Sequence, residues 1–396
     1  MALKYVTEGN FNNKNVIARF DFNVPLSKDG SGKITDTTRI DSALPTIKYI
    51  LEQNPKKLIM MSHLGRPDGE VKMKYSLAPV AKYLAEVLGQ EVLLTESCTD
   101  RSIKTIIKLN KQKLILLENL RFHKEETDGN DEFAKTLSEY GDVFVHDAFG
   151  TAHRKHASTY QIIKYFPNNS FGGFLLQKEV EALNKIVDKP AQPFIGIMGG
   201  AKVSDKIKII EKLLVSVDKL LIGGAMAYPF LKASGHNVGK SLCDDEDVKL
   251  AKQILASPLK QKMIFPIDHL CAENPDGAAT HINKLDIPDD QMGLDIGPNT
   301  IRHYNDILKS AKTVLWNGPM GYFEKDNFSK GTFAIAESIS KLKAFTLVGG
   351  GDSVSAINKS GVSNKISHVS TGGGASLEFI ENGTLPGVQA LKFGVN

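Results

Sequence analysis

The sequence has few cysteines and no long apolar segment, and both shortages limit the kind of protein it can encode. Its three cysteines, Cys98, Cys243 and Cys271, lie far apart and are odd in number, which argues against a disulfide framework and against a Cys-x-x-Cys metal site. We therefore expect a reducing compartment, the cytoplasm. No apolar run approaches the ~20 residues of a membrane span. Residues 1–16 lack the continuous apolar stretch of a secretory signal.

The chain also lacks an excess of charge of one sign. Its 396 residues include 49 basic and 45 acidic ones, a net charge of +4, which is too balanced to indicate nucleic-acid binding. Arginine is scarce, and six of the seven arginines fall in the first 154 positions. Guanidinium groups bind carboxylates and phosphates bidentately, so this bias fits an anion site in the first half, although drift in codon usage explains it equally well. The seven are Arg19, Arg39, Arg66, Arg101, Arg121, Arg154 and Arg302.

The pattern of apolar residues predicts strands and helices that alternate along the whole chain. Strands are expected at Val16–Phe22, Leu58–Met61, Leu114–Leu117, Val143–Val145, Phe194–Met198, Leu220–Ile222, Met263–Ile267, Val314–Trp316, Phe345–Val348 and His368–Ser370. Helices are expected at Ile40–Leu51, Leu77–Leu88, Val203–Val215, Asp247–Leu255 and Phe328–Leu342. This order predicts an α/β protein with two Rossmann-like lobes, each a mostly parallel β-sheet with helices on both faces.

A loop followed by an amphipathic helix separates the two halves. The loop contains Pro167 and the pair Gly172–Gly173, and the helix runs from Leu176 to about Val187, where Asp-Lys-Pro ends it. We predict an N-terminal domain at 1–172, a linker helix at 173–188 and a C-terminal domain at 189–374.

Charged and polar residues follow the strands of the first half. Ligands of open α/β sheets bind outside the carboxyl ends of the strands, so these side chains predict a pocket for a small, strongly anionic ligand. A surface charge or a local ion pair explains any single arginine, but it explains four arginines after successive strands less well. The residues concerned are Asp21, Asn23, Arg39, His63, Arg66, Arg121 and Arg154.

The strands of the second half end in glycine instead. The stretches are GIMGGAK, LIGGA, NGPMG, LVGGGDS and STGGGAS. Glycine turns let the backbone approach a ligand closely, and free N–H groups at a helix start bind phosphate, so this half is expected to hold a nucleotide. The stretch Gly235–Ser241 looks like a Walker A loop, but only three residues separate its glycines and no convincing strand precedes it. No G-x-G-x-x-G stands at a strand-to-helix turn.

Charged residues lie among these glycines. Lys202 and Lys206 are four apart at the expected start of a helix and would share a face. Asp352 follows three glycines and opens a helix, where it serves as an N-cap, as a magnesium ligand, or as both. Glu324 is either a ribose ligand or an ordinary exposed glutamate.

At these residues the sequence resembles the phosphoglycerate kinase family. The matching stretches are RFDFNVP, SHLGRP, LENLRFHKEE, FGTAHRKH, GGAKVSDK, LIGGAMA, MGLDIGP, WNGPMGYFE, VGGGDS and STGGGAS. The resemblance implies reversible, Mg²⁺-dependent phosphoryl transfer from 1,3-bisphosphoglycerate to ADP, giving 3-phosphoglycerate and ATP. It also favours a monomer without nucleic-acid or membrane partners, in which 375–396 packs partly on the N-terminal domain.

The resemblance also assigns residues to roles. The predicted glycerate-binding residues are Asp21, Phe22, Asn23, Arg39, His63, Leu64, Gly65, Arg66, Arg121 and Arg154. The predicted nucleotide-binding residues are Lys202, Lys206, Gly223, Gly293, Asn317, Glu324, Gly350, Gly351, Asp352 and Ser353, with Asp352 reaching the metal. Catalysis is assigned to Arg39, Lys202 and Gly373.

Small departures from the family pattern concern packing and nucleotide preference. Thr37 stands where the family usually has a second Asp, and Tyr322 and His269 replace commoner apolar residues. Because the two predicted half-sites lie in different domains, we expect the domains to close during the reaction, with the linker helix and Gly172–Gly173 as candidate hinges. The alternatives are a nicotinamide-dependent oxidoreductase and a non-catalytic anion-binding protein.

Overall fold

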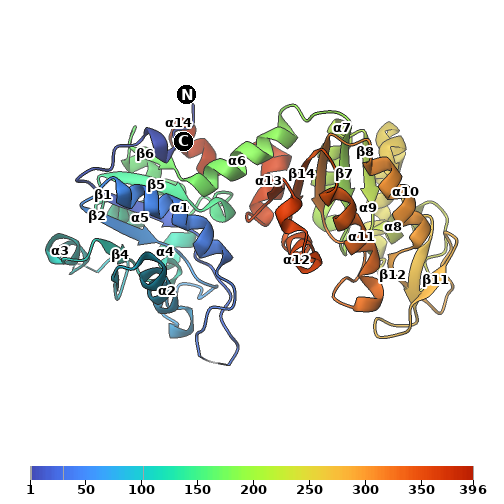
Figure 1. The fold of residues 1–396 in the computed structure, drawn as a ribbon, viewed down its shortest axis with the longest axis horizontal. Helices are drawn as coiled ribbons and strands as arrows, with labels where there is room; N and C mark the ends of the chain where they lie inside the picture. Colours follow the sequence, from blue (N-terminus) through green and yellow to red (C-terminus); the bar gives the residue numbers. More distant parts are fainter. Residues whose placement is uncertain (1, 30, 101, 396) are drawn as a thin grey trace. The chain divides into compact units, whose positions relative to one another are not determined.

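The computed structural model describes residues 2–29, 31–100 and 102–395, and it divides into two compact units (Figure 1). Unit 1 comprises Met1–Glu181 and Thr384–Asn396, and unit 2 comprises Ala182–Gly383. The division falls inside helix α6 (Phe174–Val187), within the segment 173–188 predicted as a linker helix, and the chain returns to unit 1 at Thr384. Arg101, one of the seven arginines, lies outside the described residues.

Unit 1 contains a six-stranded parallel sheet with the strand order β3-β4-β2-β1-β5-β6. The strands are β1 (Asn15–Phe20), β2 (Lys57–Met61), β3 (Val92–Leu94), β4 (Leu114–Leu116), β5 (Val143–Asp147) and β6 (Ser170–Gly172). The α-helices are α1 (Thr38–Glu52), α2 (Ala78–Leu88), α3 (Ser102–Leu109), α4 (Lys124–Thr127), α5 (Asp131–Ser138) and α14 (Pro386–Phe393), with α6 leading out of the unit. Short 3₁₀ turns lie at Val6–Glu8, Met73–Tyr75, Leu120–Phe122, Phe149–Thr151 and Gln161–Tyr165.

The two faces of this sheet bury different side chains. Val16, Ala18 and Phe20 of β1 belong to one apolar cluster with residues of α1 and α2. Successive side chains of a strand point to opposite faces, so Ile17 and Arg19 point to the other face. Arg19 is nevertheless fully buried. A charged side chain therefore lies within the packed interior of unit 1.

Unit 2 contains a second six-stranded parallel sheet, with the order β15-β14-β13-β7-β8-β9. Its strands are β7 (Phe194–Met198), β8 (Lys219–Ile222), β9 (Met263–Ile264), β13 (Thr313–Asn317), β14 (Phe345–Gly349) and β15 (His368–Val369). The α-helices are α7 (Ile207–Ser216), α8 (Ala227–Ala233), α9 (Asp245–Ala256), α10 (Pro298–Leu308), α11 (Lys330–Ser340), α12 (Gly351–Ser360) and α13 (Gly374–Asn382). The 3₁₀ turns lie at Ser204–Lys206, Pro258–Lys262, Asp326–Phe328 and Ser363–Lys365.

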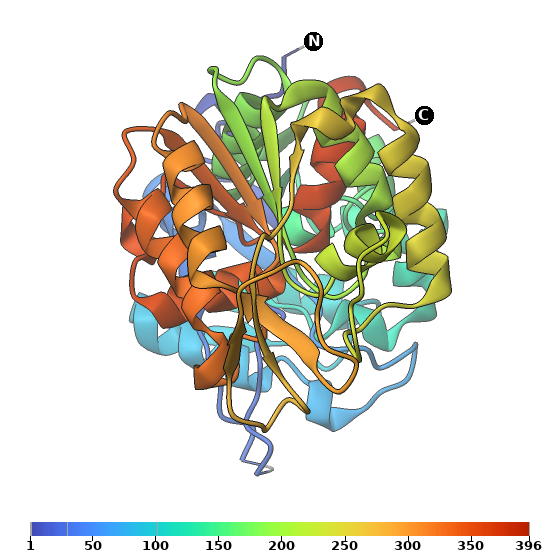
Figure 2. The same ribbon diagram turned by 90° about the vertical axis from the view of Figure 1, so that its right-hand side faces the viewer.

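A small antiparallel sheet adds to unit 2 and was not predicted. It has the order β11-β10-β12, formed by β10 (His269–Ala272), β11 (Thr280–Ile282) and β12 (Met292–Ile296), and it appears in yellow and orange in Figure 2. Its strands are short, and β11 is largely exposed. They therefore lack the continuous apolar run by which the buried strands are recognised.

The predicted fold class is confirmed, with corrections to the bounds of several elements. The strand expected at Val16–Phe22 ends at Phe20, and the helix expected at Phe328–Leu342 spans Lys330–Ser340. The strand expected at Met263–Ile267 ends at Ile264, since Pro266 has no N–H group for the ladder. The helix expected from Val203 begins at Ile207, after a 3₁₀ turn. The Asp247 carboxylate accepts hydrogen bonds from the N–H groups of Val203 and Ser204 at 3.2 and 2.8 Å, which holds this segment in a separate turn.

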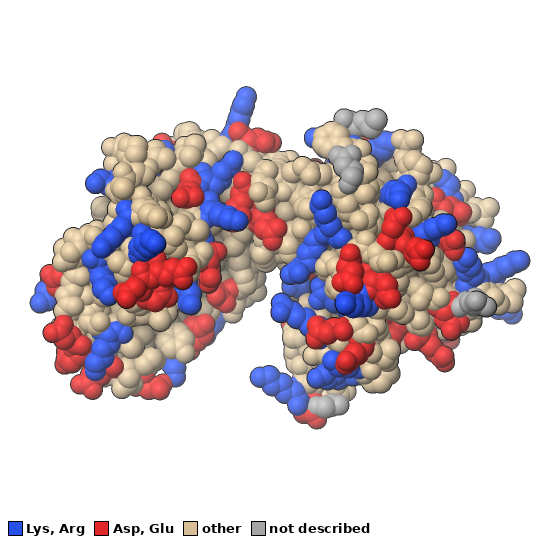
Figure 3. Space-filling view, turned by 180° about the vertical axis from the view of Figure 1, so that it is seen from behind, with Lys and Arg blue, Asp and Glu red and all other residues tan. Residues whose placement is uncertain are grey.

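The surface carries both signs of charge. Figure 3 shows basic and acidic side chains interspersed on each unit, in keeping with the near-balanced composition. Among the described helices, none has the length and apolar character needed to cross a membrane.

Candidate functional site

The carboxyl end of β1 in unit 1 holds a buried carboxylate paired with an arginine. Asp21 directly follows β1, and its Oδ2 accepts a hydrogen bond from Nη1 of Arg39 at 2.7 Å. Arg39 lies in the first turn of α1 and is partly exposed, whereas Asp21 is buried. The next residue, Phe22, is buried, and its N–H donates to Oγ of Ser62 after β2. The Phe22–Ser62 hydrogen bond thereby joins the segments that follow β1 and β2, and Arg39 lies beside them through its bond to Asp21.

A glycine turn brings a second set of predicted residues together. Gly65 has a φ of +64°, and its N–H donates to Oδ1 of Asn23 at 2.8 Å while its carbonyl accepts from Nη1 of Arg121 at 2.9 Å. A Cβ at this position would lie 2.5 Å from the ring of Tyr75, so only glycine fits. The carbonyl of Leu64 in turn accepts from Asn119. The strand ends of β1, β2 and β4 therefore meet, as the sequence predicts.

Positive charge gathers around His63. This side chain is buried, and its pKa lies well below the usual value because of burial and of the nearby Arg19, Arg121, Arg39 and His156. Burial, together with Arg19 and the further arginine Arg154, lowers the pKa of Arg121 to about 10. Cations held this close repel one another, and a bound anion relieves the repulsion.

Two predicted arginines stand apart from these contacts. Arg66 is exposed, and no hydrogen bond or ion pair among the described residues involves it. Arg154 is also exposed, and its Nε lies 3.1 Å from Nε2 of His153. The geometry of the free protein thus links Arg39 and Arg121 to the strand ends directly, but not Arg66 or Arg154.

Sequence reasoning missed a buried network behind this site. Arg19 donates from Nε to Oγ of Ser158 at 2.9 Å and lies 3.1 Å, through Nη2, from Nδ1 of His63. The Ser158 hydroxyl donates to Oε1 of the buried Glu126 at 2.6 Å, and its N–H donates to Oε2. The available signal was an arginine inside an otherwise apolar strand.

In unit 2 the strand-end glycines pack backbone against backbone. The N–H of Gly200 donates to the carbonyl of Pro319 at 3.0 Å, and the N–H of Gly224 donates to the carbonyl of Met320 at 2.8 Å. A Cβ on Gly224, whose φ is +65°, would lie 2.7 Å from the nitrogen of Gly200. The turns after β7, β8 and β13 therefore come together only because side chains are absent.

These turns border a cavity of about 350 Å³. Glycine backbone and apolar side chains form most of its wall, and Glu324 and Asp352 contribute carboxylates. The lining residues are Gly200, Ala201, Gly224, Ala225, Leu242, Pro275, Met292, Gly293, Leu294, Pro319, Gly321, Tyr322, Glu324 and Asp352. The predicted residue Gly223 does not line this cavity, and a Cβ there would lie 2.5 Å from Sδ of Met320, which is a packing reason for glycine.

The two lysines beside this cavity do not share a helix face, contrary to the prediction. Lys202 is exposed in a loop, and Lys206 closes the 3₁₀ turn before α7. The Lys206 ammonium donates to the carbonyl of Gly199 at 2.7 Å. Burial lowers the pKa of Lys206 to about 8, against the opposing effect of Asp352 and Asp205.

Two helices of unit 2 begin at glycines, and no side chain caps the N-terminal end of either one. The cap of α12 is Gly350, with a φ of +92°, so Asp352 lies in the first turn and the N-cap alternative is wrong. Ser353 accepts from the N–H of Gly318 at 2.5 Å. The cap of α13 is Gly373, with a φ of +55°, and no atom lies within 4 Å of a Cβ built on it. Both ends can receive phosphate oxygens.

Asn317 connects the strand end of β13 to that of β14. Its Nδ2 donates to the carbonyl of Gly349 at 2.7 Å, and its Oδ1 is buried without a hydrogen-bond partner among the described residues. A Cβ on Gly350 would overlap Nδ2 of this side chain.

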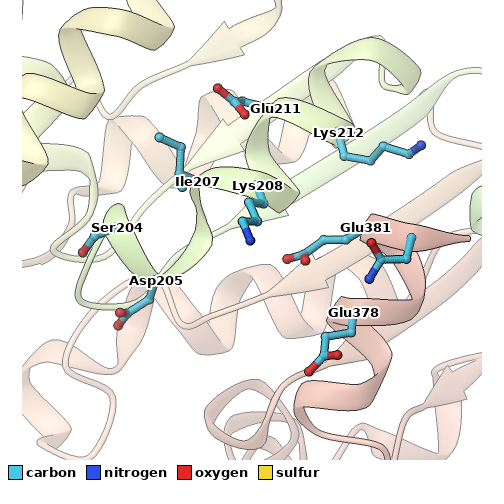
Figure 4. A pocket seen from close by; sticks show the side chains of 9 residues that line it. Ser204, Asp205, Ile207, Lys208, Glu211, Lys212, Glu378 and Glu381 are labelled. Carbon is cyan, nitrogen blue, oxygen red and sulfur yellow. The ribbon is translucent and has the colours of Figure 1, made fainter. Parts of the chain in front are cut away.

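A larger concavity of about 800 Å³ lies elsewhere in unit 2, between α7 and α13 (Figure 4). It contains none of the predicted site residues, and its wall mixes acidic side chains such as Glu378 and Glu381 with Lys208 and Lys212. Burial and Glu378 raise the pKa of Glu381, while Lys208 opposes them. It has no glycine turn, so the smaller cavity is the better candidate for a nucleotide.

Comparison with known proteins agrees with the geometry of both units. The family described as "Phosphoglycerate kinase" matches residues 6–383. Curated proteins named phosphoglycerate kinase are 49% identical in Borrelia hermsii, over 99% of this chain and 100% of that protein, and 48% identical in Finegoldia magna, over 99% of each.

Solved structures agree as well. Phosphoglycerate kinase from Coxiella burnetii has a TM-score of 0.90 and 39% identity, and it covers 100% of both chains. The enzyme from Pyrococcus horikoshii OT3 has a TM-score of 0.85 and 33% identity over 99% of both chains. Nothing in these comparisons supports an oxidoreductase or a non-catalytic anion-binding protein. This chain belongs to the phosphoglycerate kinase family and is a phosphotransferase that acts between 1,3-bisphosphoglycerate and ADP.

Proposed function

We propose that unit 1 binds the glycerate substrate at the strand ends of β1, β2 and β4. The observation that carries this assignment is the set of cations around the buried, neutral His63, beside the Asp21–Arg39 pair. Arg39 and Arg121 bind the carboxylate and phosphate groups, because a planar guanidinium offers two parallel donors to such groups. The remaining members are Phe22, Asn23, Leu64, Gly65, Arg66 and Arg154.

The nucleotide is assigned to the glycine-lined cavity of unit 2. Its apolar wall suits a base and its carboxylate Glu324 suits a ribose hydroxyl. The phosphates are assigned to the N-terminus of α12, where free N–H groups occur and where Lys206 interacts electrostatically with Asp352. Lys202, in the loop after Gly200, is assigned to them as a second cation. The turn Gly350–Ser353, Asn317, Gly223 and Gly293 complete the assignment.

Transfer itself needs positioning and positive charge rather than a protein nucleophile. A β-phosphate oxygen of ADP attacks the acyl phosphate, the phosphorus–carboxyl oxygen bond breaks, and 3-phosphoglycerate leaves with the bonding electron pair. Arg39, Lys202 and the N–H groups at Gly373 stabilise the charge on the moving phosphoryl oxygens. Because the two substrates are assigned to different units, the units close to bring them in line and exclude water.

Magnesium is the metal that this donor set fits. Asp352 is exposed, lines the cavity and lies at the start of α12. In the part of the chain that the structure describes, no group of three metal-ligating side chains occurs. Mg²⁺ suits such a site, since it keeps several waters and takes one or two carboxylates plus substrate phosphates. When bound it neutralises the charge of the nucleotide phosphates.

We also propose a cytoplasmic monomer, in keeping with the three free thiols.

The assignment of each substrate to one unit has a direct binding test. Calorimetric titration of Arg121→Met should show weaker binding of 3-phosphoglycerate and unchanged binding of ATP·Mg²⁺. Lys206→Met should show the reverse. Arg302→Met, an exposed arginine of α10, is the matched control and should change neither affinity. Loss of ATP binding in Arg121→Met, with the fold intact, would contradict the assignment.

A further inference from the structure

Arg19 is held in one orientation by three different acceptors. Its Nε donates to the Ser158 hydroxyl, its Nη1 donates to the carbonyl of Phe20, and its Nη2 faces Nδ1 of His63 at 3.1 Å. Ser158 is fixed in turn by Glu126, which takes both its hydroxyl and its N–H. The Arg19 guanidinium cannot reach other hydrogen-bond partners, because its own side chain and those of Ser158, Glu126 and His63 are all buried.

This contact determines which imidazole nitrogen of His63 carries the proton. A guanidinium donates hydrogen bonds and accepts none, and it stays protonated in proteins. Nδ1 of His63 must therefore be the acceptor and bear a lone pair. A neutral imidazole with a bare Nδ1 has its proton on Nε2. No hydrogen bond among the described residues uses Nε2, so this donor is available to a ligand.

We propose that Arg19 is a positioning residue that holds His63 as the neutral tautomer protonated on Nε2, so that His63 offers the glycerate substrate a hydrogen-bond donor rather than a positive charge. This inference rests on the glycerate-binding role proposed for His63. Arg19 acts through His63, and Glu126 acts through Ser158 to keep Arg19 in place.

The charges around His63 agree with a neutral ring. The groups that face it are the cations Arg19, Arg121 and Arg39, the imidazole of His156, and Asp21, whose Oδ1 lies 3.9 Å from Nδ1. Burial and the cations disfavour the imidazolium, and they lower the pKa of His63 well below its ordinary value. A single carboxylate, already bound to Arg39, does not reverse this.

The test is the ¹⁵N spectrum of the histidine side chains in the full chain at neutral pH. The two nitrogens of a neutral ring differ strongly in shift, and a His63→Gln sample assigns the signals. We expect Nε2 protonated and Nδ1 bare in the wild type. In Arg19→Met or Ser158→Ala the two tautomers should mix, while the signals of the exposed His303 stay unchanged as a control. The KM for 3-phosphoglycerate should rise about tenfold, the scale of one lost hydrogen bond, with the KM for ATP unchanged.

Each outcome of these measurements either supports or overturns the proposed role of Arg19. A wild-type His63 protonated on Nδ1, or charged at neutral pH, would overturn the proposal without any variant, even if a variant failed to fold. A folded variant that keeps the pure Nε2 tautomer would show that Arg19 does not set it. Addition of 3-phosphoglycerate should shift the Nε2 signal. If it does not, the donor role is overturned, whereas the proposed function of the protein fails only if the wild type also lacks transferase activity.

Discussion

Arg39 and Asp21 form an ion pair in which one partner is buried and the other is partly exposed. The buried carboxylate fixes one edge of the guanidinium, which leaves the remaining N–H groups free to bind an anion at the end of β1. Asp21 is thus an orienting group for Arg39. This orienting role explains how an acidic residue fits into the proposed site for an anionic substrate.

Replacement of Arg39 tests its role in transfer. Arg39→Ala should lower kcat by ~10²-fold, the scale of losing one donor to a developing charge. Binding of ATP·Mg²⁺ should stay unchanged, because that ligand is assigned to unit 2. Steady-state kinetics and calorimetry give the two numbers, with Arg302→Ala as the matched control. A wild-type kcat in Arg39→Ala would remove this residue from the mechanism.

Lys206 predicts a pH dependence. Its pKa is lowered to about 8, so it is charged below pH 8 and loses its charge as the pH rises through 8. The kcat/KM for ATP, which reports the free protein, should therefore fall above pH 8, approaching tenfold per unit. Lys206→Arg keeps the charge over this range and should lack the inflection. The same inflection in both proteins would assign it to another group.

At the scale of single residues, the sequence predicted most of the contacts that lie after strands and missed those that lie within them. Asp21, Asn23 and Arg121 could be placed because parallel strands end at a common edge. Arg19 carries no such positional signal, since its partners Ser158 and Glu126 are distant in sequence. A network of this kind depends on tertiary packing, which residue patterns do not encode locally.

At the scale of elements, the N-terminus of α12 depends on a glycine with two separate constraints. Gly350 has a φ of +92°, and a Cβ there would overlap Nδ2 of Asn317. Gly361, at the other end of the same helix, has a φ of +74° but open space around it. Gly350 is therefore required both for its positive φ and for the close contact with Asn317, whereas Gly361 is required for its positive φ alone.

A matched pair of variants separates these constraints. Gly350→Ala and Gly361→Ala should each lower the free energy of unfolding by about 1 kcal/mol or more, the scale of a left-handed non-glycine residue. Only Gly350→Ala should weaken ATP binding, because only there does the new methyl group displace Asn317. Denaturant unfolding and calorimetry measure the two effects. Equal ATP affinity in both variants would contradict the placement of the phosphates at α12.

A buried carboxyl group at the end of β5, that of Asp147, lies against the start of α6. Oδ1 of Asp147 accepts from the N–H of Leu176 at 3.0 Å, and a Cβ on Gly173 would overlap this carboxyl group. Burial raises the pKa of Asp147 from 3.8 to about 7. The folded protein therefore holds a proton here that the unfolded chain releases, which favours folding at low pH. This contribution is complete below pH 3.8 and is lost as the pH rises through about 7.

Asp147→Asn removes this titration. The free energy of unfolding of the variant, relative to the wild type, should increase as the pH is raised from 5 to 8. In this range the folded wild type binds a proton at Asp147 that its unfolded chain does not, so its stability falls with pH, whereas the variant has no such group. Urea unfolding at both pH values measures the difference. An unchanged difference between pH 5 and pH 8 would mean that Asp147 does not titrate in this range. Gly173, which packs against this carboxyl group, has no titratable side chain, so the experiment needs no Gly173 control.

The elements that sequence patterns predicted poorly share a physical cause. The strands β10 to β12 are short and partly exposed, so neither a continuous apolar run nor a clean alternation marks them. The turn before α7 is set by Asp247, a residue of another helix, and not by its own sequence. The long buried strands β7 and β13, in contrast, were located to within a residue.

At the scale of the whole molecule, the proposed division of substrates between two units requires them to approach during the reaction. Small-angle scattering with 3-phosphoglycerate and ATP·Mg²⁺ together should give a smaller radius of gyration than with either ligand alone. The reason is that closure is expected to require the charged groups of both substrates. Arg39→Ala lacks the guanidinium group that is assigned to the transferred phosphoryl group, so its radius of gyration should decrease less. A radius that does not change with both ligands would count against closure.

The most direct measurement of the central claim is phosphoryl transfer itself. Purified protein with ATP, Mg²⁺ and 3-phosphoglycerate, observed by ³¹P NMR, should form ADP and an acyl phosphate, and the reverse mixture should form ATP. Omission of Mg²⁺ should stop the reaction in both directions. Persistent ATP and 3-phosphoglycerate in the complete mixture, with a folded protein, would contradict the account.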